Sequence, residues 1–61
     1  MNGKHVIKIL EAHGWMLDRV TGSHHVMMKG ARAVPIPVHG AKDLKIGLIK
    51  GIERQTEVKL I

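Results

Sequence analysis

The chain has 61 residues, which predicts a single domain over residues 1–61 with a thin core, because so short a chain buries only about 60% of its unfolded surface. Ten Lys and Arg against five Asp and Glu leave a formal charge of +5, which favours nucleic acid or an acidic protein as partner. The absence of cysteine excludes disulfides and thiolate metal sites, and no apolar stretch is long enough for a membrane span, so we expect a cytoplasmic protein.

The first element is an amphipathic helix predicted over residues 3–13, where apolar residues recur at helical spacing. Asn2 is a suitable N-cap ahead of it. Gly14 stands where a left-handed residue commonly ends a helix, and Trp15 is placed to pack back onto the helix end.

Two strands are predicted next, over residues 15–20 and 24–29, joined by a tight turn in which Gly22 takes a positive φ. Simple alternation places Leu17 and Arg19 on the same face of the first of these strands. These two strands therefore form a hairpin.

A third strand is predicted over residues 33–38, and its Pro35 and Pro37 place it at a sheet edge because proline cannot donate to a ladder. A second amphipathic helix is predicted near residues 44–56. Gly47 and Gly51 within it each cost about 1 kcal/mol relative to alanine, so we expect them to allow close approach to the sheet or a ligand.

The order helix, three antiparallel strands, helix predicts an α+β fold, α-β-β-β-α, with one three-stranded sheet covered on one face by both helices. Double-stranded-RNA-binding domains have this architecture, and their readout of phosphates and 2′-hydroxyls suits a basic chain. Trp15 is the only aromatic residue, which argues against a row of rings for stacking single-stranded bases.

Four segments of the chain form a specific pattern when they are taken together and in order: Gly14-Trp15, Arg19-Val20-Thr21-Gly22-Ser23-His24-His25, Val34-Pro35-Ile36-Pro37-Val38-His39 and Lys42-Asp43-Leu44-Lys45-Ile46-Gly47. With these segments the chain resembles the HicA toxins, which are small messenger-RNA interferases of bacterial type II toxin–antitoxin systems. The resemblance covers nearly the whole chain.

The resemblance implies a fold like the double-stranded-RNA-binding domain, a toxin that cleaves messenger RNA and so stops translation and growth, and neutralisation by a cognate HicB antitoxin. The family's catalytic histidine lies in its Gly-Ser-His motif, which falls on His24 here. His24 would then act as general acid or base on the scissile phosphodiester. An imidazole suits this role because it gains and loses a proton near neutral pH. Such cleavage needs neither a metal nor a cofactor, since the 2′-hydroxyl of RNA is itself the nucleophile.

Further candidates for RNA contacts lie around this motif. His25 faces the opposite way from His24, because adjacent strand residues alternate. His39 follows the third strand, and Lys42 and Lys45 precede the second helix, whose free N–H groups would join them in binding a phosphate. Arg19 either steadies the scissile phosphate or pairs with a neighbouring acid.

Two other functional classes are open to a basic chain of this kind. A non-catalytic RNA-binding module of the same fold is the alternative to a ribonuclease. A DNA-binding regulator needs a helix with base-reading side chains on its exposed face, and neither predicted helix has such a run. The five histidines are not spaced to share a metal ion, since His5 and His13 lie about 12 Å apart along the first helix.

Overall fold

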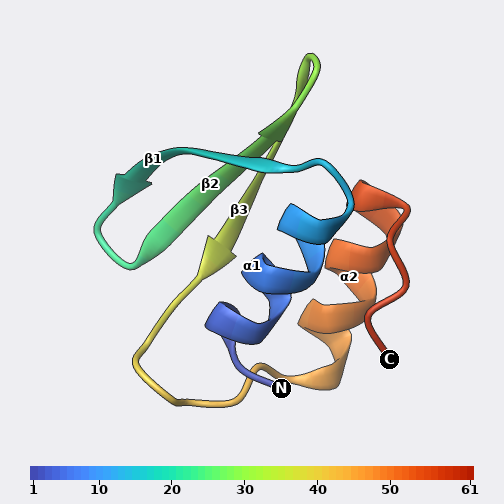
Figure 1. Ribbon diagram of the computed structural model, residues 1–61. Helices are drawn as coiled ribbons and strands as arrows, with labels where there is room; N and C mark the ends of the chain where they lie inside the picture. The colour runs from blue at the N-terminus through green and yellow to red at the C-terminus, as the bar shows by residue number, and fades with distance from the viewer.

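A computed structural model describes residues 1–61 and confirms the predicted α+β order, with every element boundary within two residues of the one expected. The three strands form one antiparallel sheet in the order β1-β2-β3, and both helices lie on the same side of it (Figure 1). Neither helix is long and apolar enough to cross a membrane. The elements are α1 (Gly3–Ala12), β1 (Met16–Thr21), β2 (His24–Lys29), β3 (Arg32–Pro37) and α2 (Ile46–Thr56).

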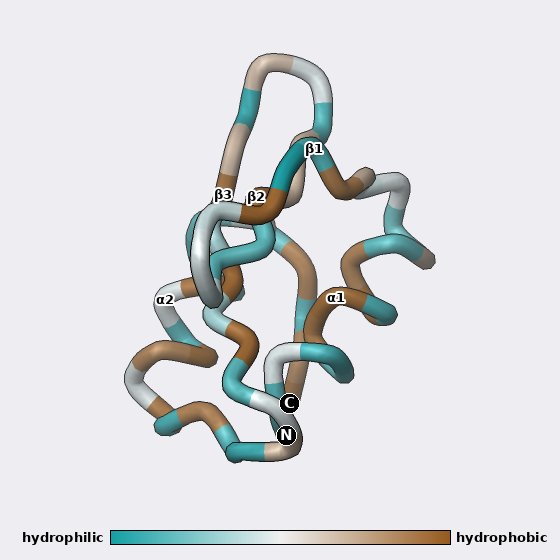
Figure 2. Tube along the Cα trace, turned by 90° about the vertical axis from the view of Figure 1, so that its left-hand side faces the viewer, coloured by the Kyte–Doolittle hydropathy of each residue, from teal (hydrophilic) through white to brown (hydrophobic).

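The core lies between the helices and the face of the sheet that they cover. Alternation along β2 and β3 turns Met27, Val34 and Ile36 toward the helices, and hydrophobic segments recur along both helices where they approach the sheet (Figure 2). Residues 57–61 neither extend α2 nor form a strand, but run back as an irregular tail. The buried core consists of Val6, Leu10, Trp15, Met27, Val34, Ile36, Ile49, Ile52, Val58 and Leu60.

A β-bulge in β1 corrects the predicted faces of that strand. Leu17 pairs with Met27, whereas Arg19 pairs with Val26, so the register shifts between the two and Asp18 is the extra residue. An extra residue reverses the alternation beyond it. The prediction that Leu17 and Arg19 share a face is therefore wrong: Leu17 is on the helix side and Arg19 on the uncovered side.

The edge position of β3 is confirmed, and the residues opposite its two prolines explain why the sheet accommodates them. Pro37 lies opposite His24, and Pro35 lies opposite Val26. The backbone N–H of Val38 donates to the carbonyl of Ser23 at 2.7 Å, which continues the pairing one step past β3. Since hydrogen-bonded and non-hydrogen-bonded pairs alternate, both prolines fall on non-hydrogen-bonded pairs, where a backbone N–H would point outward.

Close helix approach occurs at a different glycine from those expected. A Cβ added at Gly47 would meet nothing within 4 Å, and one at Gly51 would meet only Arg54 Nη2 at 3.8 Å, so the expected close approach of these glycines to the sheet is wrong. A Cβ at Gly3 would instead lie 2.2 Å from the carbonyl oxygen of Pro37. The absent side chain of Gly3 lets the start of α1 pack against the end of β3.

Candidate functional site

His24 is the first residue of β2, directly after the turn that joins β1 to β2. Gly22 has a φ of 59° and Ser23 a negative φ, as in a type II′ turn with glycine at its first central position. His24 is paired with Thr21 on one side and Pro37 on the other, and its side chain is exposed. Its face of the sheet is the one that the helices leave uncovered.

The segment that leaves β3 runs close to His24. The bond between Val38 and Ser23 holds this segment against the β1–β2 turn. A second turn follows at once, because Gly40 has a φ of 58° and the Lys42 N–H donates to the His39 carbonyl at 3.1 Å. The fold thus gathers three of the predicted site residues, and we call the group of His24, His39 and Lys42 the histidine corner.

Lys45 lies beyond this corner at the start of α2. It is the N-cap residue, its side chain makes no capping bond, and the first turn of α2 carries no acidic residue. The N–H groups at this helix start are therefore open to an anion. The preceding loop is held in place by the Leu44 N–H, which donates to the Met1 carbonyl at 2.8 Å.

The two remaining candidates, Arg19 and His25, lie on opposite faces of the sheet. Arg19 lies on the same sheet face as His24, but its Nη1 donates to Asp18 Oδ2 at 2.6 Å. His25 lies on the helix side opposite Ile36, is half-buried, and has an Nδ1 that is shut from solvent without a hydrogen-bond partner. The histidine corner therefore contains His24 and not His25.

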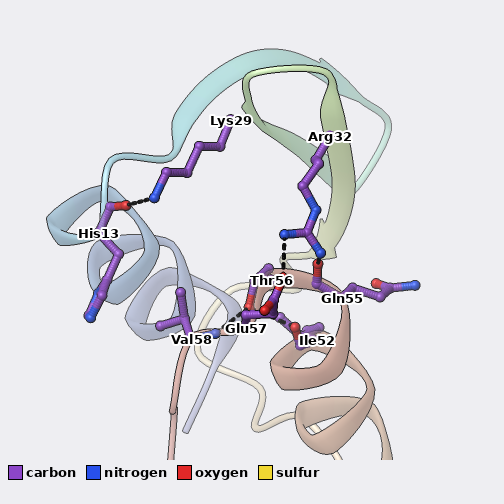
Figure 3. Close-up of polar contacts among 8 residues, drawn as sticks. All are labelled: His13, Lys29, Arg32, Ile52, Gln55, Thr56, Glu57 and Val58. Carbon is purple, nitrogen blue, oxygen red and sulfur yellow. Dashed lines mark hydrogen bonds and ion pairs between the residues drawn. The ribbon is translucent and has the colours of Figure 1, made fainter.

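The distribution of charge leaves most basic residues free. Four of the ten Lys and Arg side chains contact carboxylates or carbonyls: Arg19, Lys29, Arg32 and Lys50. Lys29 and Arg32 do so at the end of the sheet opposite the histidine corner (Figure 3). The side chains of the other six form no hydrogen bond or ion pair in the protein, and those of Lys42 and Lys45 are among them. The chain's net positive charge is thus presented by side chains that are available to a polyanion.

Two residues that shape this region, Gly3 and His5, were not identified from the sequence. Gly3 fixes how closely α1 approaches the end of β3. His5 completes a capping box: the Asn2 N–H donates to His5 Nδ1 at 3.4 Å, and the His5 N–H donates to Asn2 Oδ1 at 3.0 Å. The usual signal for a capping box is Glu or Gln three residues after the cap, so a histidine at that position does not predict one.

The chain was compared with known families and curated sequences. A sequence profile described as "HicA toxin of bacterial toxin-antitoxin" matches residues 3–58. The chain belongs to the HicA toxin family. A HicA toxin implies an antitoxin partner, and the resemblance seen in the sequence is confirmed. No curated protein sequence matches significantly. No three His, Asp or Glu side chains of this HicA-family chain lie close enough together to hold a metal ion.

Proposed function

We propose that this HicA-family toxin is a metal-independent endoribonuclease that cleaves messenger RNA in the cytoplasm with His24 as general acid or base. The observation that carries the proposal is the exposure of His24 on the sheet face that the helices leave uncovered. An imidazole there is accessible to a phosphodiester. Proton transfer by such a group accelerates a reaction by about 10²- to 10⁴-fold.

RNA binding is assigned to the residues around that corner. Lys42 and Lys45, with the open N–H groups at the start of α2, provide phosphate contacts, and His39 extends them. Arg19 contributes from the neighbouring strand once its bond to Asp18 is exchanged for a phosphate. His25 would contact RNA only through the exposed part of its ring, since it lies on the helix-covered face of the central strand and its Nδ1 is shut from solvent.

A ribonuclease assay in the presence of EDTA tests the assignment. The parent should fragment RNA with the chelator present, and His24→Ala should lose this activity. His13→Ala is the matched control, because His13 is also an exposed histidine but lies at the end of α1. Cleavage by His24→Ala at the parent's rate would exclude His24 as the catalytic group.

The same assay separates the alternative, a non-catalytic RNA-binding module of this fold. Both proteins bind RNA with an affinity that falls steeply with salt. Only the ribonuclease cuts the RNA into shorter fragments. In cells, expression of the chain should arrest growth, and co-expression of the cognate HicB antitoxin should restore it; normal growth with intact His24 would contradict the toxin mechanism.

A further inference from the structure

We propose that His39 is a second catalytic imidazole, and that His24 and His39 act as an acid–base pair on the two sides of the scissile phosphate. This inference rests on the ribonuclease activity proposed above. It assigns His39 a proton-transfer role beyond contact with RNA.

The backbone pairing places the two histidines on one face. His24 lies opposite Pro37, and the bond from the Val38 N–H to the Ser23 carbonyl at 2.7 Å keeps the segment after β3 in register. Val38 is turned toward the helices, since a Cβ at Gly3 would lie 2.9 Å from Val38 Cγ2. Alternation then returns His39 to the uncovered face that carries His24.

The spacing suits a phosphate between the two rings. His24 and His39 are diagonal neighbours across the extended ladder, an arrangement with about 7–8 Å between Cα atoms. In phosphoryl transfer the attacking and leaving oxygens lie roughly in line on opposite sides of phosphorus. Two imidazoles at this separation can each approach one of these oxygens to a hydrogen-bond distance of about 2.6–3.2 Å.

The ring nitrogens of both histidines are free for this chemistry. The imidazoles that form hydrogen bonds within the protein are those of His5 and His13. One imidazole of the pair takes the proton of the RNA 2′-hydroxyl as its oxygen bonds to phosphorus. The other gives a proton to the 5′-oxygen as the P–O5′ bond breaks, leaving a 2′,3′-cyclic phosphate and a 5′-hydroxyl. Exchange with water then resets both rings.

Lys42 is the competing proton donor at this corner. The charged residues of the loop after His39 are Lys42 and Asp43, and the Asp43 carboxylate is paired with the N-terminal ammonium at 3.3 Å. On this face β3 brings only the uncharged Ala33, Pro35 and Pro37, and Arg19 of β1 is a diagonal neighbour of His24, not of His39. Arg19 is permanently charged and cannot exchange protons. A test must therefore distinguish His39 from Lys42.

The dependence of kcat/KM on pH makes this distinction. We expect a bell-shaped profile for the parent, with one limb for the general base and one for the general acid. His39→Gln should lose one limb and about 10²- to 10⁴-fold in rate. Its affinity for an uncleavable RNA with a 2′-deoxy group at the cleavage site should fall only by what one lost RNA contact explains, which is far less than the fall in rate. Lys42→Gln should keep both limbs, and thermal unfolding verifies that each variant is folded.

A substrate with sulfur in place of the bridging 5′-oxygen assigns the two roles. A thiolate leaves without a proton, so this substrate should restore cleavage to whichever of His24→Ala and His39→Gln lacks the acid. The proposal is overturned if His39→Gln keeps both limbs, if it loses only affinity, or if Lys42→Gln removes the limb instead. If the parent does not cleave RNA, the proposed function falls as well, whereas an inactive His24→Ala beside an active His39→Gln refutes His39 alone.

Discussion

The two ends of the sheet differ in how their side chains are used. At one end, which holds the β2–β3 turn and the C-terminal ends of both helices, Lys29 Nζ donates to the His13 carbonyl at 2.8 Å. Arg32 there bonds to the Glu57 carboxylate at 2.8 Å and to the Gln55 carbonyl at 2.6 Å (Figure 3). We call this the clamped end. The opposite end holds the histidine corner and the start of α2, and its side chains make few bonds of this kind.

The difference separates stability from function within 61 residues. At the clamped end, polar side chains join strands to helices and so stabilise the packing. At the histidine corner, backbone bonds such as that from Val38 to Ser23 hold the chain. The imidazole and ammonium groups are therefore left unpaired, which is the state in which they bind a ligand.

The strongest test of this separation is a pair of substitutions, one at each end. His24→Ala should reduce RNA cleavage by about 10²- to 10⁴-fold while changing the free energy of unfolding by no more than about 0.5 kcal/mol. Arg32→Met should leave cleavage by the folded protein unchanged and lower the free energy of unfolding by about 1 kcal/mol. Urea unfolding and an RNA cleavage assay measure both. Loss of stability in His24→Ala would remove the distinction.

Thr56 sharpens the account of the clamped end. Its buried Oγ1 donates to the Ile52 carbonyl at 2.7 Å and accepts from the Val58 N–H at 3.3 Å. Thr56→Val keeps the shape but leaves that N–H without a partner, so the free energy of unfolding should fall by about 1–3 kcal/mol. Thr56→Ser is the control and should fall less. A larger loss in Thr56→Ser than in Thr56→Val would show that the methyl group contributes more than the hydroxyl.

At the other end, the lysines predict the salt dependence of RNA binding. Lys42→Gln and Lys45→Gln should each lower the slope of log affinity against log salt by about 0.7, the value for one phosphate contact on a single strand. Arg54→Gln removes the same charge from the last turn of α2 and serves as the control. A slope that falls equally in all three variants would mean that net charge alone determines binding.

The smallest expected effect concerns pH and the carboxylate of Glu53. The N–H groups of Leu60 and Ile61 donate to it at 2.6 and 3.1 Å, and these bonds, with help from Lys50, lower its pKa below the ordinary value of 4.5. A carboxylate with a lowered pKa stabilises the fold above the ordinary value, and this stabilisation is lost as pH falls through the lowered one.

The melting temperature of the parent should therefore drop as the pH is lowered below about 4.5. Glu53→Gln should start from a lower melting temperature at neutral pH and show a shallower acid dependence. A variant whose acid dependence matches the parent's would assign the effect to other carboxylates.

Local signals in the sequence predicted most of the fold. Asn2 and Gly14 delimit α1, Gly22 sets the hairpin turn, and Pro35 and Pro37 place β3 at an edge; all of these depend on residues close in the chain. The bulge at Asp18 was not predicted, because polar and apolar residues are mixed on both faces of β1 and no hydrophobic pattern fixes the strand register.

Features that join distant parts of the chain could not be predicted in the same way. The approach of Gly3 to Pro37 and the bond between Ser23 and Val38 depend on tertiary packing. The motif around His24 and the position of His39 were both recognised in the sequence, but their proximity was not. Gly47 and Gly51 show the opposite error, since glycine in a helix does not by itself mark a contact.

The prolines of β3 have a consequence for how this sheet joins others. Their rings stand where the outer edge would otherwise offer two N–H donors, so a strand that added there would lose two hydrogen bonds of its ladder. β1, by contrast, is exposed along all six residues and contains no proline. Extension of the sheet is thus favoured along β1, and pairing of two copies through β1 would leave a proline-bearing edge at each end, which disfavours open-ended fibre growth.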